Sequence, residues 1–110
     1  MDFDRYLFPG QLFPLGSVTV TDRAKEILAA NEVPPLTLLK RHATGDWGDI
    51  RENDKKENDL NLPIGRRITS GYRLELGVRL WITTEPDRSA TTIYAVADYV
   101  DAGGFQDHED

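Results

Sequence analysis

The apolar residues change their spacing near residue 66, and this change constrains the fold more than any other feature. Before it they recur at the three- and four-residue spacing of helices, and after it they alternate with polar residues, as in half-buried strands. The expected strands are joined by a short turn at 75–77 and a longer loop at 85–90, which favours antiparallel pairing. The sequence therefore predicts an α+β fold, with N-terminal helices packed on one face of a three- to four-stranded antiparallel sheet. The expected strands are 66–74, 78–84 and 91–96, with a shorter one at 16–21.

Local signals place two helices in the first half of the chain. Thr21 is a suitable N-cap for a helix over 22–31, because its hydroxyl can accept a hydrogen bond from the first turn. A second helix over 35–43 begins with proline, which is tolerated there because the missing N–H would have no helical partner. Gly45 is expected to end this second helix.

The segment 45–60 places a Trp between two glycines and follows it with an acidic stretch. Asp49 and Glu52 have the spacing of a capping-box variant, which predicts a third helix that begins near Ile50. That helix carries few apolar residues and is expected to lie on the surface. We therefore expect Trp47 to be largely buried and to tie this acidic segment to the body of the protein.

The length of 110 residues indicates a single domain. We expect an extended aromatic arm at 1–14, one α+β domain at 15–99 and an acidic flexible tail at 100–110. The net charge is −6, and the sequence from Asp98 onward holds five acidic residues without Lys or Arg. The chain has no Cys, which excludes disulfides and thiol chemistry and fits a cytoplasmic location. No apolar run is long enough to span a membrane, and no metal, cofactor or membrane partner is expected.

The polar face of the predicted sheet is the first candidate site. It collects arginines, threonines and aromatic residues, and guanidinium groups beside aromatic rings can stack unpaired bases and hold phosphates. Exposed sheet faces favour the same residue types for ordinary reasons, so a plain solvent-facing surface is the alternative. The candidate binding residues are Trp47, Arg79, Trp81 and Tyr94.

His42 is the second candidate, as a general acid or base. It stands near the end of a predicted helix, where the helix dipole favours the charged imidazolium. A capping or half-buried histidine is the more ordinary interpretation of the same position.

The loop 83–92 is the third candidate. Arg88 could hold a phosphate bidentately, with Ser89 or Thr91 donating a further hydrogen bond. Pro86 and Asp87 are also ordinary turn residues, so this loop has a purely structural interpretation as well. The candidate catalytic residues are His42, Arg67, Arg73, Arg88 and Ser89.

Two sequence blocks resemble a family of small proteins encoded on plasmids and integrative mobile elements. They are Gly-Asp-Trp-Gly at 45–48 and Thr-Glu-x-x-Arg-Ser-x-Thr-Thr at 84–92, and the resemblance covers roughly residues 15–99. It implies a prokaryotic, mobile-element setting and carries no assigned activity. The chain departs from the family in Pro86 and Tyr94. Its order of His, Arg and Ser is also similar to that of the small ribonuclease fold shared by barnase-like and RelE-like toxins, which act without metal.

Two functional hypotheses follow. In the first, the protein is a metal-independent RNA- or nucleotide-acting enzyme, in which His42 transfers protons and the arginines stabilise the phosphate. In the second, it is a non-catalytic accessory protein of the anti-restriction or anti-CRISPR type, which binds a host defence or other partner protein. The first requires His42 and at least one arginine around a common cleft, and the second requires only a suitable surface. The sequence leaves the oligomeric state open.

Overall fold

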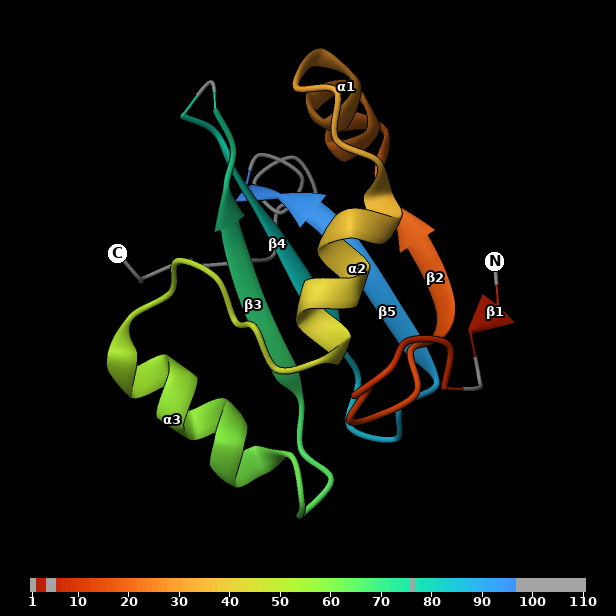
Figure 1. Cartoon of the computed structure of the whole chain (residues 1–110), viewed down its shortest axis with the longest axis vertical. Coiled ribbons are helices and arrows are strands. Elements are labelled where there is room, and N and C mark those ends of the chain that lie inside the picture. The colour runs from red at the N-terminus through yellow and green to blue at the C-terminus, as the bar shows by residue number, and fades with distance from the viewer. Residues whose placement is uncertain (1, 4–5, 76, 97–110) are drawn as a thin grey trace.

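The computed structural model describes residues 2–3, 6–75 and 77–96, which form an α+β fold (Figure 1). Every expected helix and strand is present, and one further short strand precedes them. The helices are α1 (Asp22–Ala30), α2 (Pro35–Ala43) and α3 (Glu52–Asn61). The strands are β1 (Asp2–Phe3), β2 (Gly16–Val20), β3 (Ile68–Arg73), β4 (Arg79–Thr84) and β5 (Ala90–Ala95). The acidic segment 100–110 and the predicted domain end at 97–99 lie outside the described residues.

The sheet has the order β1-β2-β5-β4-β3 and is mixed. The pairs β3–β4, β4–β5 and β1–β2 are antiparallel, whereas β2 and β5 are parallel, from Ser17 opposite Ala90 to Val20 opposite Ile93. The prediction of a purely antiparallel sheet is therefore wrong. Alternation along a strand reports which face is buried but not the direction of the neighbouring strand. The long connection through α1, α2, α3, β3 and β4 allows β5 to return beside β2 in the same direction.

The helix α2 lies across one face of the sheet, and the main core forms between them (Figure 1). Its residues Leu38, Leu39 and Ala43 are buried, and Ala24 and Leu28 of α1 join the same core. The strand residues expected to face the helices are buried, with two exceptions: Leu74 follows β3 and is partly buried, and Val78 precedes β4 and is 39% exposed. The buried strand residues of this face are Ile68, Ser70, Tyr72, Leu80, Ile82, Ile93 and Ala95.

The predicted arm at 1–14 is only partly extended, because residues 6–14 form no strand. Phe13 is buried in the core and Phe8 packs against it, whereas Tyr6 is exposed. Gln11 holds the loop, since its side-chain oxygen accepts from the Phe8 main chain at 3.0 Å and its amide donates to the Phe13 carbonyl at 2.8 Å. The sequence before β2 therefore contributes one large aromatic residue to the core.

The helix α3 lies beside β3, at the free edge of the sheet, and not across the face that α2 covers (Figure 1). The side-chain amide of Asn58 donates to the Thr69 carbonyl at 2.8 Å and accepts from the Thr69 N–H at 3.3 Å. The predicted capping box is wrong, since α3 begins at Glu52 after Arg51, which has no side-chain capping bond. The Asp49 carboxylate accepts instead from the Arg73 N–H of β3, at 2.6 Å.

The Gly-Asp-Trp-Gly segment covers the middle of the same edge. The Gly71 N–H donates to the Trp47 carbonyl at 3.3 Å, and the Asp49 N–H donates to the Gly71 carbonyl at 2.7 Å. Gly48 between them has a φ of 80°, and a Cβ atom there would overlap the Gly71 carbonyl oxygen. Trp47 is 5% exposed, and its indole N–H donates to Asp59 of α3 at 3.0 Å. The expectation that Trp47 anchors the acidic segment is confirmed.

Candidate functional site

His42 lies inside the core and has no exposed surface. Its Nδ1 atom is 2.6 Å from the Ser70 hydroxyl oxygen, and its Nε2 atom is 2.9 Å from the Thr84 hydroxyl oxygen. The Phe13 and Trp47 rings contact the imidazole edge-on, with centroids 5.4 and 6.0 Å away. The helix end that suggested a charged imidazolium therefore points this side chain into the protein.

The hydrogen-bond chain around His42 has one consistent direction. The Thr91 hydroxyl donates to the Leu15 carbonyl at 2.7 Å, so the Thr84 hydroxyl must donate to Thr91, also at 2.7 Å. Thr84 then accepts from His42, which places the imidazole proton on Nε2, and Ser70 donates to the bare Nδ1. The chain joins α2 to β3, β4, β5 and the segment before β2.

Burial, together with the smaller effect of the positive charge of Arg88, lowers the pKa of His42 from 6.5 to about 3. A neutral imidazole with both nitrogens bonded inside the protein cannot exchange protons with a ligand at the surface. His42 is thus a fully buried core residue, which differs both from the predicted general acid or base and from the capping or half-buried histidine that was the alternative.

Arg88 stands in the turn before β5 with a φ of 61°, and its guanidinium serves the fold. Its donors reach the main-chain carbonyls of Arg66 at 2.7 Å, Glu85 at 3.2 Å and Leu62 at 3.3 Å. The guanidinium also lies over the Phe13 ring, 5.4 Å from its centroid. These contacts tie the end of α3 and the start of β3 to this turn, so the guanidinium is not presented to a phosphate.

The remaining predicted catalytic residues are spread over the surface. Ser89 is exposed, and its main-chain N–H donates to the Asp87 carboxylate in the same turn at 3.0 Å. Arg67 precedes β3 and pairs with Glu85 at 3.2 Å. Arg73 ends the same strand and is six residues away, roughly 20 Å along an extended chain. Together with the buried His42 they do not form a common cleft.

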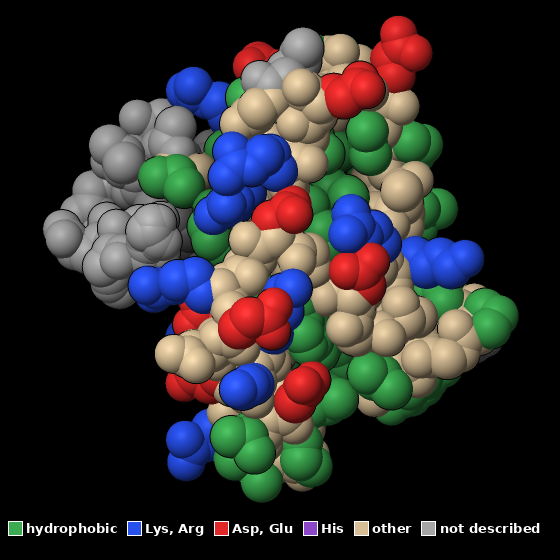
Figure 2. All heavy atoms as spheres, turned by 60° about the vertical axis from the view of Figure 1, so that its left-hand side comes forward, with side chains coloured by type: hydrophobic (Ala, Val, Ile, Leu, Met, Phe, Trp, Pro, Cys, Tyr) green, Lys and Arg blue, Asp and Glu red, His purple; other side chains and the backbone are tan. Residues whose placement is uncertain are grey.

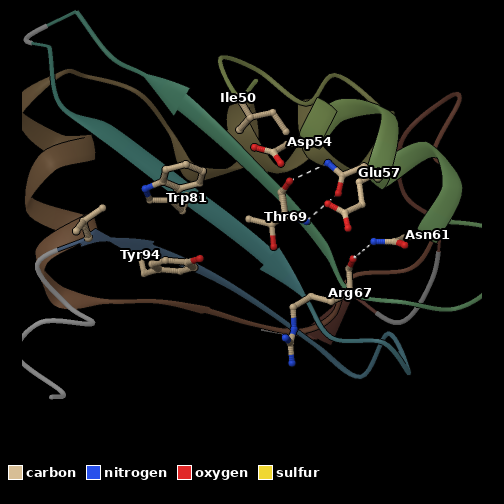
Figure 3. A pocket seen from close by; sticks show the side chains of 10 residues that line it. Ile50, Asp54, Glu57, Asn61, Arg67, Thr69, Trp81 and Tyr94 are labelled. Atoms are coloured by element: carbon tan, nitrogen blue, oxygen red, sulfur yellow. Dashed lines mark hydrogen bonds between the residues drawn. The ribbon is translucent and has the colours of Figure 1, made fainter. Parts of the chain in front are cut away.

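A pocket of about 310 Å³ lies between α3 and the sheet face that the core helices leave uncovered (Figure 3). It contains three of the residues predicted from sequence, Arg67, Trp81 and Tyr94, on the polar sheet face. The other predicted residues lie outside its lining, including Trp47 and Arg79. The pocket is lined by Ile50, Asp54, Glu57, Asn58, Asn61, Arg67, Thr69, Trp81, Tyr94 and Val96.

The aromatic side of the pocket depends on a glycine in β3. Gly71 lies opposite Trp81 in the register, and a Cβ atom there would meet Cζ3 of the indole at 2.9 Å and the Ile50 side chain at 3.2 Å. The missing side chain therefore lets the indole lie close over β3. The Arg79 guanidinium lies over the same ring, 5.3 Å from its centroid. The indole N–H and Arg79 Nε are both buried and without a hydrogen-bond partner among the described residues.

Two residues of the lining, Thr69 and Tyr94, are linked by a row of hydroxyl groups across three strands. The hydroxyl oxygens of Thr69 and Thr83 are 3.2 Å apart, and those of Thr83 and Tyr94 are 2.9 Å apart. Because these groups bond one another, they fix the orientation of the Tyr94 ring that lines the pocket. Figure 3 shows this ring and Trp81 on one side of the pocket and the α3 side chains on the other.

The α3 side of the pocket is rich in acceptors. Asp54, Glu57 and Asn61 point from the helix toward it (Figure 3). Asn61 donates to the Arg67 carbonyl at 3.3 Å, which leaves its side-chain oxygen as an acceptor. Asp54 makes a loose pair with Arg51 at 3.5 Å, and in the described part of the chain Glu57 has no ion-pair partner. Two carboxylates thus face one arginine that is already paired.

On the side of α3 and β3, the described residues form no extended area of one charge (Figure 2). In the view that brings the side of α3 and β3 forward, Lys and Arg side chains alternate with Asp and Glu (Figure 2). Over the described residues no group of three His, Cys, Asp or Glu side chains could hold a metal ion. Within the same residues, no helix is both long and apolar enough to cross a membrane.

The sequence interpretation missed the α3 side of the site. It treated the acidic helix only as a surface helix with few apolar residues. Asp54, Glu57 and Asn61 are spaced by three and four positions, which places them on one face of a helix. That spacing was the available signal, but it does not show which structure the face lies against.

Comparisons of the chain with protein-family models, with curated proteins and with solved structures found no match.

Proposed function

We propose that this protein is a non-catalytic binding protein, which recognises a positively charged segment of a partner protein through the pocket between α3 and the sheet. The observation that supports this proposal is the lining of the pocket. The carboxylates of Asp54 and Glu57 stand on one side, and the rings of Trp81 and Tyr94 stand on the other. Carboxylates attract cations by charge and aromatic faces attract them through the ring quadrupole. A basic side chain can interact with the carboxylates and with the aromatic rings at the same time.

The positions of the predicted catalytic residues argue against an enzyme that acts on RNA or nucleotides. Such catalysis requires an acid or base and a phosphate-binding group around one reacting atom. His42 is buried and neutral, and Arg88 donates to three main-chain carbonyls. The pocket itself contains no histidine among its lining residues. The positions of these residues therefore favour a binding protein over an enzyme.

The charge of the pocket also argues against a phosphate-bearing ligand. Asp54 and Glu57 repel an anion, and Arg67 is the single basic residue in the lining. Arg67 is more than half exposed and already pairs with Glu85 at 3.2 Å. Its remaining attraction for a phosphate is screened by solvent and by this partner. The same charges favour a cation.

The setting implied by the family resemblance belongs to the same proposal. In a mobile-element protein that resides in the cytoplasm, the partner would be a host defence protein, as for anti-restriction and anti-CRISPR proteins. The partner would present a basic side chain in an exposed segment, because the pocket opens at the surface beside α3.

Titration of the isotope-labelled protein with a basic peptide that contains both Arg and Lys tests this function. We expect the NMR signals of the Trp81 indole and the Asn61 side-chain amide to shift, and added salt to weaken binding. The Asp54→Asn/Glu57→Gln double variant should lose most of the affinity, whereas Glu52→Gln should keep it. Glu52 lies on the same helix, pairs with Lys55 and does not line the pocket, so its variant removes one negative charge from α3 outside the pocket.

An acidic peptide of the same length and a single-stranded uridine oligonucleotide serve as the contrasting ligands. Shifts of the pocket signals by the oligonucleotide, without shifts by the basic peptide, would overturn the proposal in favour of nucleic-acid binding. A basic peptide that binds the double variant and the native protein equally would show that the pocket is not the binding site.

A further inference from the structure

We infer that the group bound in the pocket is the guanidinium of an arginine, in preference to the ammonium of a lysine. This inference rests on the proposed function and names its ligand. The acceptors on α3 give the first reason. Asp54, Glu57 and Asn61 present oxygen atoms along about two turns of one helix face. A guanidinium spreads five N–H donors over a plane and can bond two of these groups together, whereas an ammonium concentrates its charge at one point.

Glu57 is the central acceptor of this row. Asp54 and Asn61 each have one partner within the protein, at 3.5 and 3.3 Å, whereas Glu57 makes no ion pair in the described residues. The neighbouring Asn58 cannot contribute, because both ends of its amide bond Thr69. A guanidinium that pairs with Glu57 has Asp54 one turn before it and Asn61 one turn after it on the same face.

The opposite wall gives the second reason. The indole of Trp81 is held close over β3 because Gly71 has no side chain. The Arg79 guanidinium lies 5.3 Å from the centroid of this ring, and a ligand guanidinium would make the same kind of contact with the neighbouring Tyr94 ring of the lining. Guanidinium groups stack on aromatic rings and are more weakly hydrated than ammonium groups, which favours arginine at a half-enclosed aromatic site.

The size of the pocket gives the third reason. Its volume of about 310 Å³ is at the lower end of the range for ligand pockets, which is about 300–1,000 Å³. This space suits one long side chain and is small for a helix or a folded element. The partner is therefore expected to insert a single residue, with its main chain remaining outside the pocket.

Three small probes test the inference on the full chain: acetyl-arginine amide, acetyl-lysine amide and acetyl-citrulline amide. Citrulline has nearly the shape of arginine without the charge. We expect the arginine probe to bind about tenfold more tightly than the lysine probe, and the citrulline probe to bind least, as judged by shifts of the Trp81 and Asn61 signals. Glu57→Gln should lower the affinity for the arginine probe about tenfold, and Glu52→Gln should leave that affinity unchanged.

Each outcome bears on the inference. Equal binding of arginine and lysine probes, with loss in Glu57→Gln, would overturn the choice of arginine and leave the proposed function standing. Equal binding of arginine and citrulline probes would overturn the choice of a cation. If none of the probes shifts the pocket signals but the basic peptide does, the partner does not bind by inserting a single residue. The protein then contacts the partner over a larger surface. If the basic peptide fails as well, the proposed function falls with the inference.

Discussion

The side-chain amide of Asn58 bonds both main-chain groups of Thr69, in the way that a neighbouring strand would. This pair joins the acidic helix α3 to the free edge of β3 and sets the width of the pocket between them. Replacement of Asn58 by Ala leaves a donor and an acceptor of Thr69 without partners, which should cost about 1–3 kcal/mol of unfolding free energy. Urea denaturation measures this loss, and an unchanged midpoint would show that α3 is held by other contacts.

Asn58→Asp distinguishes the two bonds of that pair. The carboxylate still accepts from the Thr69 N–H but faces the Thr69 carbonyl where the amide donated. We expect this variant to be less stable than Asn58→Ala at neutral pH. Because protonation restores a donor, its stability relative to Asn58→Ala should recover as the pH falls through the carboxyl range near about 4. An unchanged difference between the two variants on acidification would contradict this geometry.

Trp47 anchors the segment that contains the pocket residues of α3. Trp47→Ala removes a buried indole packed on Phe13 and should cost roughly 3–5 kcal/mol of unfolding free energy. Asp59→Asn is the control, since Asn keeps an acceptor for the indole N–H and should cost less than about 1 kcal/mol. A loss below about 1 kcal/mol for Trp47→Ala, in denaturant melts, would show that the indole is a surface contact.

Gly48 is the residue of the Gly-Asp-Trp-Gly block that tolerates substitution least. A Cβ atom there would overlap the Gly71 carbonyl and meet the Tyr72 ring at 2.6 Å, in a backbone with positive φ. Gly65 has a similar φ of 72° and open space around it, so Gly65→Ala measures the conformational strain alone, about 1–2 kcal/mol. We expect Gly48→Ala to lower the unfolding free energy by several kcal/mol more than Gly65→Ala does, as measured by thermal or denaturant unfolding. Equal losses would indicate that the edge of β3 adjusts freely.

His42 makes the stability of the protein depend on pH. Its pKa is about 3 when folded and 6.5 when unfolded, so between these values the unfolded chain binds a proton that the folded protein does not. The contribution of His42 to the unfolding free energy is therefore fully present above pH 6.5. It falls as the pH drops toward 3, by up to about 1.4 kcal/mol per pH unit. Urea melts over this range measure the slope.

The matched variant for this measurement is His42→Gln, which can donate to Thr84 and cannot be protonated. Asp46, whose pKa is lowered by its hydrogen bond to Arg41, also weakens the protein in acid, but equally in both proteins. The difference between native protein and variant therefore isolates His42. Equal slopes between pH 6.5 and about 4 would show that water reaches the imidazole.

The two sequence blocks that carry the family resemblance serve mainly the fold. In the first block Gly48 and Trp47 clamp the edge of β3, and in the second Thr84, Thr91 and Arg88 bond buried or main-chain groups. No residue of either block lines the pocket. A specific motif with Gly, Trp, Arg and Thr thus has a sufficient structural explanation, and the candidate site stands beside it.

The sequence by itself determined the class of the fold, the helices and strands and the buried face of the sheet. These features follow from local propensity and hydrophobic periodicity, which are properties of neighbouring residues. It also placed Trp81 and Tyr94 on the polar face, and it identified Trp47 as an anchor. Each of these depends on spacing along one element.

Only the tertiary structure decided the direction of β2, the fate of His42 and the composition of the pocket. Strand direction depends on pairing between segments that are over 70 residues apart. Whether His42 at a helix end meets solvent or Ser70 and Thr84 depends on which face of α2 lies on the sheet. The pocket joins an acidic helix to an aromatic strand face, and that proximity is set by the edge contacts of β3. Local sequence encodes the conformation of each element, whereas chemistry between elements arises only when packing brings them together.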